Sequence, residues 1–195
     1  MFYLGMDLGK MRDHTAIAIV ERGHPGEPLQ ARYAKRMPLG TPYPEVVERV
    51  RRMVGHELLR GRCALAVDAT GVGSPVVDML RSGGLGCGLS AVNITGGEKE
   101  THSGNVWSVP KRDLMTGVQV LLEKRELRIA RRLEEGGALI RELTNIRMTA
   151  GAGGRLRMGA DGGGEHDDLA IALALACWRA KRRENGYGTQ RIPGI

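Results

Sequence analysis

Cysteine and aromatic residues are scarce in this chain of 195 residues. The three cysteines, Cys63, Cys87 and Cys177, are odd in number and widely spaced, and they form no C-x-x-C pair. Structural disulfides and cysteine zinc sites are therefore not expected, and a reducing compartment fits. Aromatic residues make up 4% of the chain, which argues against stacking platforms for single-stranded nucleic acid.

Targeting and membrane-spanning segments are also missing from the sequence. The N-terminus, M-F-Y-L-G-M-D, has no basic region and does not read as a signal peptide. The longest apolar run, Leu169 to Trp178, is too short to cross a bilayer. We therefore expect no membrane partner and a cytoplasmic location.

Positive charge is in excess. The formal net charge is +7 and the pI is near 9.7, which favours a polyanionic partner, with nucleic acid first, although a basic surface also aids solubility. The length suits one domain, and 42% hydrophobic residues suffice for a core of Leu, Val, Ile, Ala and Met.

Hydrophobic patterning predicts an α/β fold with a mixed sheet. Three strands joined by short glycine-containing links are expected to be antiparallel, at Phe2–Met6, Thr15–Val20 and Leu29–Met37. Two buried strands, Cys63–Val67 and Leu89–Ile94, flank a helix with Ser74 as N-cap and Pro75 as first residue, which indicates a parallel βαβ unit. The sheet is thus predicted to have three antiparallel and then two parallel strands, flanked by helices.

The other helices follow from apolar stripes or acidic starts. They are predicted at Pro44–Leu59, with Leu58 on the apolar stripe, at Lys111–Glu123, at Leu133–Asn145, and from the H-D-D run to about Glu184. Glycines around the strand Arg155–Met158 predict a mobile β-hairpin before the last helix, within a domain spanning 1–184. Residues 185–195 are expected to form a flexible tail.

The last helix has an unusual composition. In L-A-I-A-L-A-L-A, Leu169 to Ala176, large and small residues alternate, so a helix would be covered on two sides and approached closely along its alanines. Its acidic N-terminus would then be held rigidly against the sheet.

Acidic residues stand at the ends of apolar elements. Asp7 and Asp68 each end an apolar strand, and parallel neighbours bring such ends to one edge of a sheet. Asp167 and Asp168 would approach from the last helix. Clustered carboxylates stay ionised only with cations between them, and oxygen ligands suit Mg²⁺ or Mn²⁺. Two ions about 4 Å apart would clamp a phosphodiester. Any one of these acids alone is more simply a turn or capping residue; the joint pattern carries the prediction.

Four segments taken together resemble the C-terminal nuclease domain of phage terminase large subunits, a ribonuclease H-like fold related to RuvC-type resolvases. The segments are Gly5–Ala18, Ala66–Gly73, Val109–Leu114 and His166–Ala176. The resemblance implies a two-metal endonuclease that cuts double-stranded, concatemeric viral DNA during packaging. It also implies a terminase ATPase domain, a small terminase subunit and a portal as partners in a bacterial host cell.

Carried over to this sequence, the resemblance implies metal ligands at Asp7, Asp68 and the Asp167-Asp168 pair. Asp168 is favoured as main ligand, with the choice between the two left open. Asp13 matches a further acid of the first segment and is either an outer ligand or a turn residue. His166 either orients a carboxylate or water, or caps the helix.

Basic residues near these segments are candidates for DNA phosphates, with a solvated charged surface as the alternative. They are Lys10, Arg12, Lys111, Arg112, Arg155 and Arg157. The run Arg179 to Arg183 lies at the far end of the last helix, where it complements the helix dipole.

Other functions remain open at this point. A RuvC-like resolvase would prefer branched DNA, and a non-catalytic domain would bind DNA without cutting it. The D-L-G and D-A-T-G-V-G stretches also resemble phosphate loops of actin-like ATP-binding domains, which are much longer. Because G-x-x-x-x-G-K-[ST] is absent, we expect an excised domain or a stand-alone product of prophage origin, not a packaging motor by itself.

Overall fold

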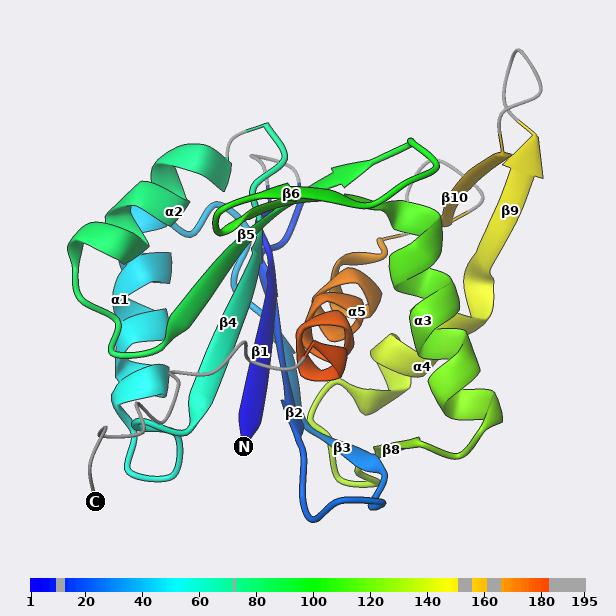
Figure 1. Cartoon of the computed structure of the whole chain (residues 1–195), viewed down its shortest axis with the longest axis horizontal. Helices are drawn as coiled ribbons and strands as arrows, with labels where there is room; N and C mark the ends of the chain where they lie inside the picture. The colour runs from blue at the N-terminus through cyan, green and yellow to red at the C-terminus, as the bar shows by residue number, and fades with distance from the viewer. Residues whose placement is uncertain (10–12, 72, 151–155, 161–165, 183–195) are drawn as a thin grey trace, which may run out of the picture.

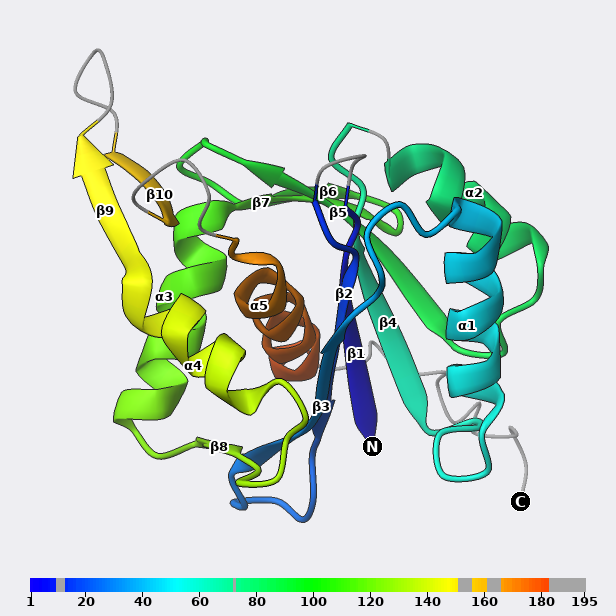
Figure 2. The same ribbon diagram turned by 180° about the vertical axis from the view of Figure 1, so that it is seen from behind.

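The structure is a computed structural model that describes residues 1–9, 13–71, 73–150, 156–160 and 166–182. Its centre is an eight-stranded mixed sheet with helices on both faces (Figures 1 and 2). The expected tail, 185–195, lies outside the described residues. Within these residues no helix is both long enough and apolar enough to cross a membrane.

The predicted strands form the middle of this sheet, in the order β5-β4-β1-β2-β3. Strand β1 (Phe2–Asp7) pairs antiparallel with β2 (Ala16–Glu21), which pairs antiparallel with β3 (Leu29–Arg36). On its other side β1 runs parallel to β4 (Cys63–Asp68), and β4 runs parallel to β5 (Gly88–Thr95). The expected three antiparallel and two parallel strands are confirmed.

Three short strands extend the sheet at its edges and were not predicted. At one edge lie β6 (Thr101–Ser103) and β7 (Val106–Pro110), and at the other lies β8 (Leu127–Ile129). They have three to five residues, and β6 is fully exposed, so no buried alternation marks them in the sequence.

Two layers of helices cover the sheet (Figure 1). Helices α1 (Tyr43–Gly55) and α2 (Gly73–Ser82) pack on one face. Helices α3 (Lys111–Glu123) and α4 (Gly136–Asn145) lie on the other face. Helix α5 (Asp168–Lys181) is almost wholly buried between the sheet and α3 and α4. The long apolar run of the sequence is therefore a core helix.

Several helix ends differ from the prediction. Helix α1 ends at Gly55 because the backbone of His56 is extended, with ψ of 143°, and Leu58 is consequently 56% exposed instead of buried. Helix α2 begins at Gly73, so Ser74 lies inside its first turn and is not its N-cap. Helix α4 begins at Gly136, and α5 spans only Asp168–Lys181.

The expected β-hairpin is present before α5. Strand β9 (Ile146–Ala150) follows α4 directly and pairs antiparallel with β10 (Leu156–Ala160), and together they form a separate ribbon (Figure 1). Arg157 lies in β10 opposite Thr149, and Arg155 is outside the described residues.

Close approach between β1 and α5 depends on one glycine. A Cβ atom on Gly5 would overlap the Ala172 carbonyl oxygen and lie 2.5 Å from the Ala176 amide nitrogen. The glycine and the two alanines thus let the helix backbone touch the strand, as expected from the alanine pattern. This contact fixes the start of α5 relative to the end of β1.

Candidate functional site

Two carboxylates meet at the carboxyl edge of the central parallel strands. Asp7 ends β1 and Asp68 ends the neighbouring β4, with Met6 opposite Val67 in the parallel register. The Asp68 carboxylate lies close enough to raise the pKa of Asp7. The sequence argument required these two strands to be parallel neighbours, and the structure shows that they are.

Burial and like charges act together on Asp7. Burial raises the pKa of Asp7 well above its ordinary value, and repulsion from Asp68, Asp168 and Asp167 raises it further, while Lys111 opposes the shift. Burial also raises the pKa of Asp68, against hydrogen bonds that favour its charged form. Four aspartates from three elements therefore share one electrostatic environment.

Thr70 fixes the orientation of Asp68. Asp68 Oδ1 accepts the Thr70 backbone N–H at 2.8 Å and the Thr70 hydroxyl at 2.5 Å. The Thr70 hydroxyl oxygen in turn accepts the Ile94 N–H at 2.8 Å, which ties the turn to β5. We did not predict this role, although a threonine two residues after an aspartate is a recognised signal for such a turn.

Asp167 and Asp168 point to different partners. Asp167 Oδ2 lies 2.5 Å from Lys111 Nζ at the start of α3. Asp168 is buried, and its Oδ2 lies 3.5 Å from Arg36 Nε and 3.8 Å from His166 Nδ1. Asp167 occupies the N-cap position of α5, but its side chain makes no capping hydrogen bond. His166 thus lies beside a carboxylate, as one of its two expected roles requires.

Glu142 supplies the missing cap from another helix. Its Oε2 accepts the Ala170 N–H of α5 at 2.9 Å, and its Oε1 pairs with Arg36 Nη2. Arg36 Nη1 also pairs with Glu135 Oε2 at 2.9 Å, and Arg36 Nε lies 3.5 Å from Asp168 Oδ2. Burial raises the pKa of Glu142 to about 7, against the Ala170 hydrogen bond and the Arg36 charge. This network, which no sequence motif indicated, anchors the start of α5.

We expect Glu142→Ala to lower the free energy of unfolding by about 2–4 kcal/mol, because it leaves the Ala170 N–H and a buried part of Arg36 without their acceptor. Glu142→Gln keeps an acceptor oxygen and is expected to lose less. Urea unfolding measures both. Glu134→Ala is the matched control, since Glu134 pairs with Lys35 at the surface, where water screens the charges, and little loss of stability is expected there. An equal, small loss at Glu142 would contradict the anchoring role.

The four aspartates suit a divalent cation chemically. Asp168 Oδ2 is buried and accepts no hydrogen bond from any described residue, and all four aspartates offer only oxygen, the donor that Mg²⁺ and Mn²⁺ prefer. In the arrangement described, no three acidic, histidine or cysteine side chains among the described residues form a closed metal cage. Asp167 instead pairs with Lys111, and Asp168 lies beside Arg36.

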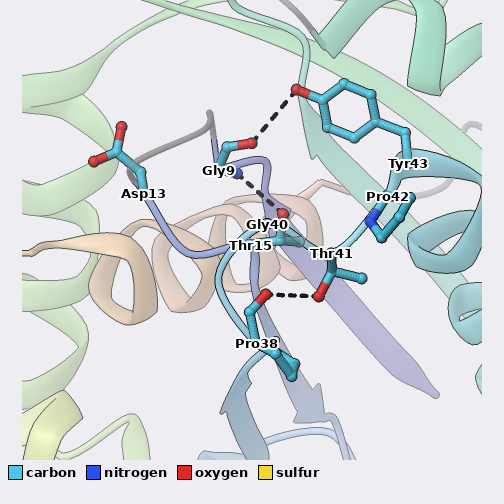
Figure 3. A pocket seen from close by; sticks show the side chains of 8 residues that line it. All are labelled: Gly9, Asp13, Thr15, Pro38, Gly40, Thr41, Pro42 and Tyr43. Atoms are coloured by element: carbon cyan, nitrogen blue, oxygen red, sulfur yellow. Dashed lines mark hydrogen bonds between the residues drawn. The ribbon is translucent and has the colours of Figure 1, made fainter.

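Asp13 lines a neighbouring pocket. It lies before β2, is exposed, and shares the pocket wall with Gly9, Thr15 and Tyr43 (Figure 3). The Gly9 N–H donates to Thr15 Oγ1 at 3.1 Å, and the Tyr43 hydroxyl donates to the Gly9 carbonyl oxygen at 3.5 Å. The Asp13 carboxylate points away from these groups, and its role as outer ligand stays a prediction.

The basic candidates are only partly described. Lys111 pairs with Asp167, a member of the acidic cluster formed by Asp7, Asp68, Asp167 and Asp168. Arg112 is exposed, and its Nε lies 3.3 Å from Asp113 Oδ1. Three of the candidates, Lys10, Arg12 and Arg155, fall outside the described residues, and of Arg157 the structure describes the backbone only.

Comparison with known proteins gives structural matches alone. No family model matches the chain. No curated protein matches it either. The large terminase nuclease of thermophilic phage G20c superposes with a TM-score of 0.69 at 21% identity, covering 94% of this chain and 83% of that one. The magnesium-bound structure of that nuclease superposes with a TM-score of 0.65 at 22% identity, covering 92% of this chain and 81% of that one. The manganese-bound nuclease domain of the bacteriophage SPP1 large terminase superposes with a TM-score of 0.56 at 16% identity, covering 92% of this chain and 86% of that one.

The chain therefore has the fold of large terminase nuclease domains, as its four sequence segments predicted. The match spans nearly the whole chain, so the expected ribonuclease H-like fold is confirmed.

Proposed function

We propose that the chain is a metal-dependent endonuclease that hydrolyses phosphodiester bonds of double-stranded DNA, as in the cutting of concatemeric viral DNA during packaging. One observation carries this proposal. Asp7 and Asp68 end two adjacent parallel strands, and the start of α5 places Asp167 and Asp168 close enough to raise the pKa of Asp7. The metal-bound nucleases of G20c and SPP1 share the fold that creates this arrangement.

Asp7, Asp68 and Asp168, with Asp167 beside them, would hold two Mg²⁺ or Mn²⁺ ions. When bound, such ions activate a water molecule and stabilise the leaving oxygen of a phosphodiester. The chain's own residues hold these carboxylates in place. Thr70 fixes Asp68, the Glu142–Arg36 pair fixes the first turn of α5, and Lys111 compensates the charge of Asp167.

The proposal includes the biological setting that the fold suggests. The nuclease would act on DNA beside a terminase ATPase domain, a small terminase subunit and a portal, in the cytoplasm of a bacterial host. The excess of positive charge supports a DNA partner.

The proposal is tested by nicking and linearisation of plasmid DNA with Mg²⁺, Mn²⁺ or EDTA. The wild type is expected to cut with either metal and not in EDTA. Asp68→Asn keeps an oxygen for Thr70 but removes the charge, and we expect cutting to fall by more than about 100-fold. Asp78→Asn is the matched control, because Asp78 is exposed on α2 and pairs only with Arg81 among the described residues.

Other outcomes identify the alternative functions. Folded wild-type protein that binds DNA and cuts nothing with either metal would overturn the nuclease and support a DNA-binding domain. A strong preference for four-way junctions over linear duplex would indicate a resolvase. Stable binding of ATP without cutting would indicate an actin-like domain.

A further inference from the structure

A polar pocket of about 380 Å³ lies beside Asp168 and is separate from the pocket of Asp13. Its walls come from the loop before β2, the end of β3, helix α4 and the segment before α5. Its polar lining residues are His14, Arg36, Arg141, Glu142, Asn145 and His166. His166 Nδ1 and Arg36 Nε also approach Asp168 Oδ2. The pocket therefore adjoins the acidic cluster directly.

The carboxylate of this pocket is already engaged. Glu142 uses one oxygen for Arg36 and the other for the Ala170 N–H, and Arg36 is further occupied by Glu135. Besides Asn145, the other polar groups of the lining are the guanidinium of Arg141 and the imidazoles of His14 and His166. Such a lining favours an anion over a metal ion.

Three nitrogen-bearing side chains supply this capacity. Arg141 is exposed on α4 and makes no ion pair or hydrogen bond with any other residue in the described part of the chain. His14 Nδ1 donates to the Met37 carbonyl oxygen at 2.9 Å, which fixes its ring and leaves Nε2 for other partners. The His166 ring packs edge-on against His14, with centroids 5.8 Å apart. A guanidinium and two imidazoles thus line the pocket next to Asp168.

We propose that this pocket binds a backbone phosphate of the DNA strand, adjacent to the phosphodiester held at the aspartates. Arg141 is the donor to the phosphate, and His14 and His166 shape the pocket beside it. The inference rests on the proposed nuclease function. Four aspartates repel a polyanion, so the strand needs a cationic contact beside them, and a guanidinium matches phosphate oxygens in a bidentate geometry. The contact positions the strand without reading its sequence.

The test measures DNA binding without metal, so that it does not depend on cutting. Anisotropy of a fluorescent duplex oligonucleotide is recorded in EDTA over a range of salt concentrations. For Arg141→Gln we expect several-fold weaker binding for every duplex sequence, and a plot of log affinity against log salt that is shallower by about 0.9, the value for one lost phosphate contact. Arg141→Lys, which keeps the charge, should restore the slope.

Arg52→Gln is the matched control, because Arg52 is exposed on α1, on the opposite face of the sheet, and should leave affinity and slope unchanged. An Arg141→Gln slope equal to that of the wild type, or a wild type that binds no duplex at low salt, would overturn the pocket. Loss of cutting in Asp68→Asn tests the nuclease separately, so either idea can fail while the other stands.

Discussion

Asp7→Asn is expected to abolish DNA cutting while leaving the protein folded and, in EDTA, more stable than the wild type. Asp7 bears the cost of burial and of repulsion from three other aspartates, and both disappear with its charge. The asparagine amide also has N–H groups that can donate to Asp68, whereas an aspartate can donate only when it is protonated. We expect a gain of about 1 kcal/mol, or roughly 3 °C in melting temperature for a chain of this size.

Bound metal should make the wild type more stable than Asp7→Asn, the reverse of their order in EDTA. A ligand that binds only the folded state stabilises it by about 2.7 kcal/mol at 100 times its dissociation constant. Mg²⁺ or Mn²⁺ should therefore raise the melting temperature of the wild type and have little effect on Asp7→Asn. Thermal unfolding in EDTA and in each metal measures this, with Asp78→Asn as control. A variant that is destabilised in EDTA and still stabilised by metal would show that Asp7 is not a ligand.

The same reasoning predicts a pH dependence in EDTA. The pKa of Asp7 is raised above its ordinary value of 3.8, so the folded state binds this proton more tightly than the unfolded state does. Its contribution to stability is full below that value and is lost as the pH rises through the raised pKa. Asp7→Asn should lack this loss.

The acids were predictable because each belongs to a local pattern. Asp7 and Asp68 each follow an apolar strand, whereas the parallel pairing of β1 with β4 is seen only in the folded structure. Asp167 and Asp168 precede an apolar helix, and the turn of that helix sends them to Lys111 on one side and Arg36 on the other. Strand period and helix period are properties of short segments, so they can be read without the tertiary structure.

The groups that hold the acids in place were not predictable in the same way. Arg36 and Glu142 are separated by 106 residues and meet only because α4 packs beside the start of α5 at the end of β3. Neither lies in a motif, and an arginine at a strand end or a glutamate in a helix is normally a surface residue. The edge strands were not predicted for a related reason. Strands β6 and β8 have three residues each, which is too short to show an alternating pattern.

Gly5→Ala should have the opposite effect on stability from Asp7→Asn. The added methyl group would overlap the backbone of α5 at Ala172 and Ala176, and a buried helix between the sheet and α3 and α4 has no room to retreat. Overpacking of a core costs about 1–3 kcal/mol, and we expect the upper end because both overlapped atoms belong to the backbone of α5. Denaturant unfolding measures the loss.

Gly117→Ala in α3 is the matched control. No atom lies within 4 Å of the position that its Cβ would occupy, so the same substitution should stabilise the helix by about 0.5–1 kcal/mol. The fraction of Gly5→Ala that still folds should also show a smaller metal-induced rise in melting temperature. A shifted α5 carries Asp167 and Asp168 away from Asp7 and Asp68, so the cation loses part of its ligand set. If Gly5→Ala were as stable as the wild type, the contact between β1 and α5 would not be what aligns the carboxylates.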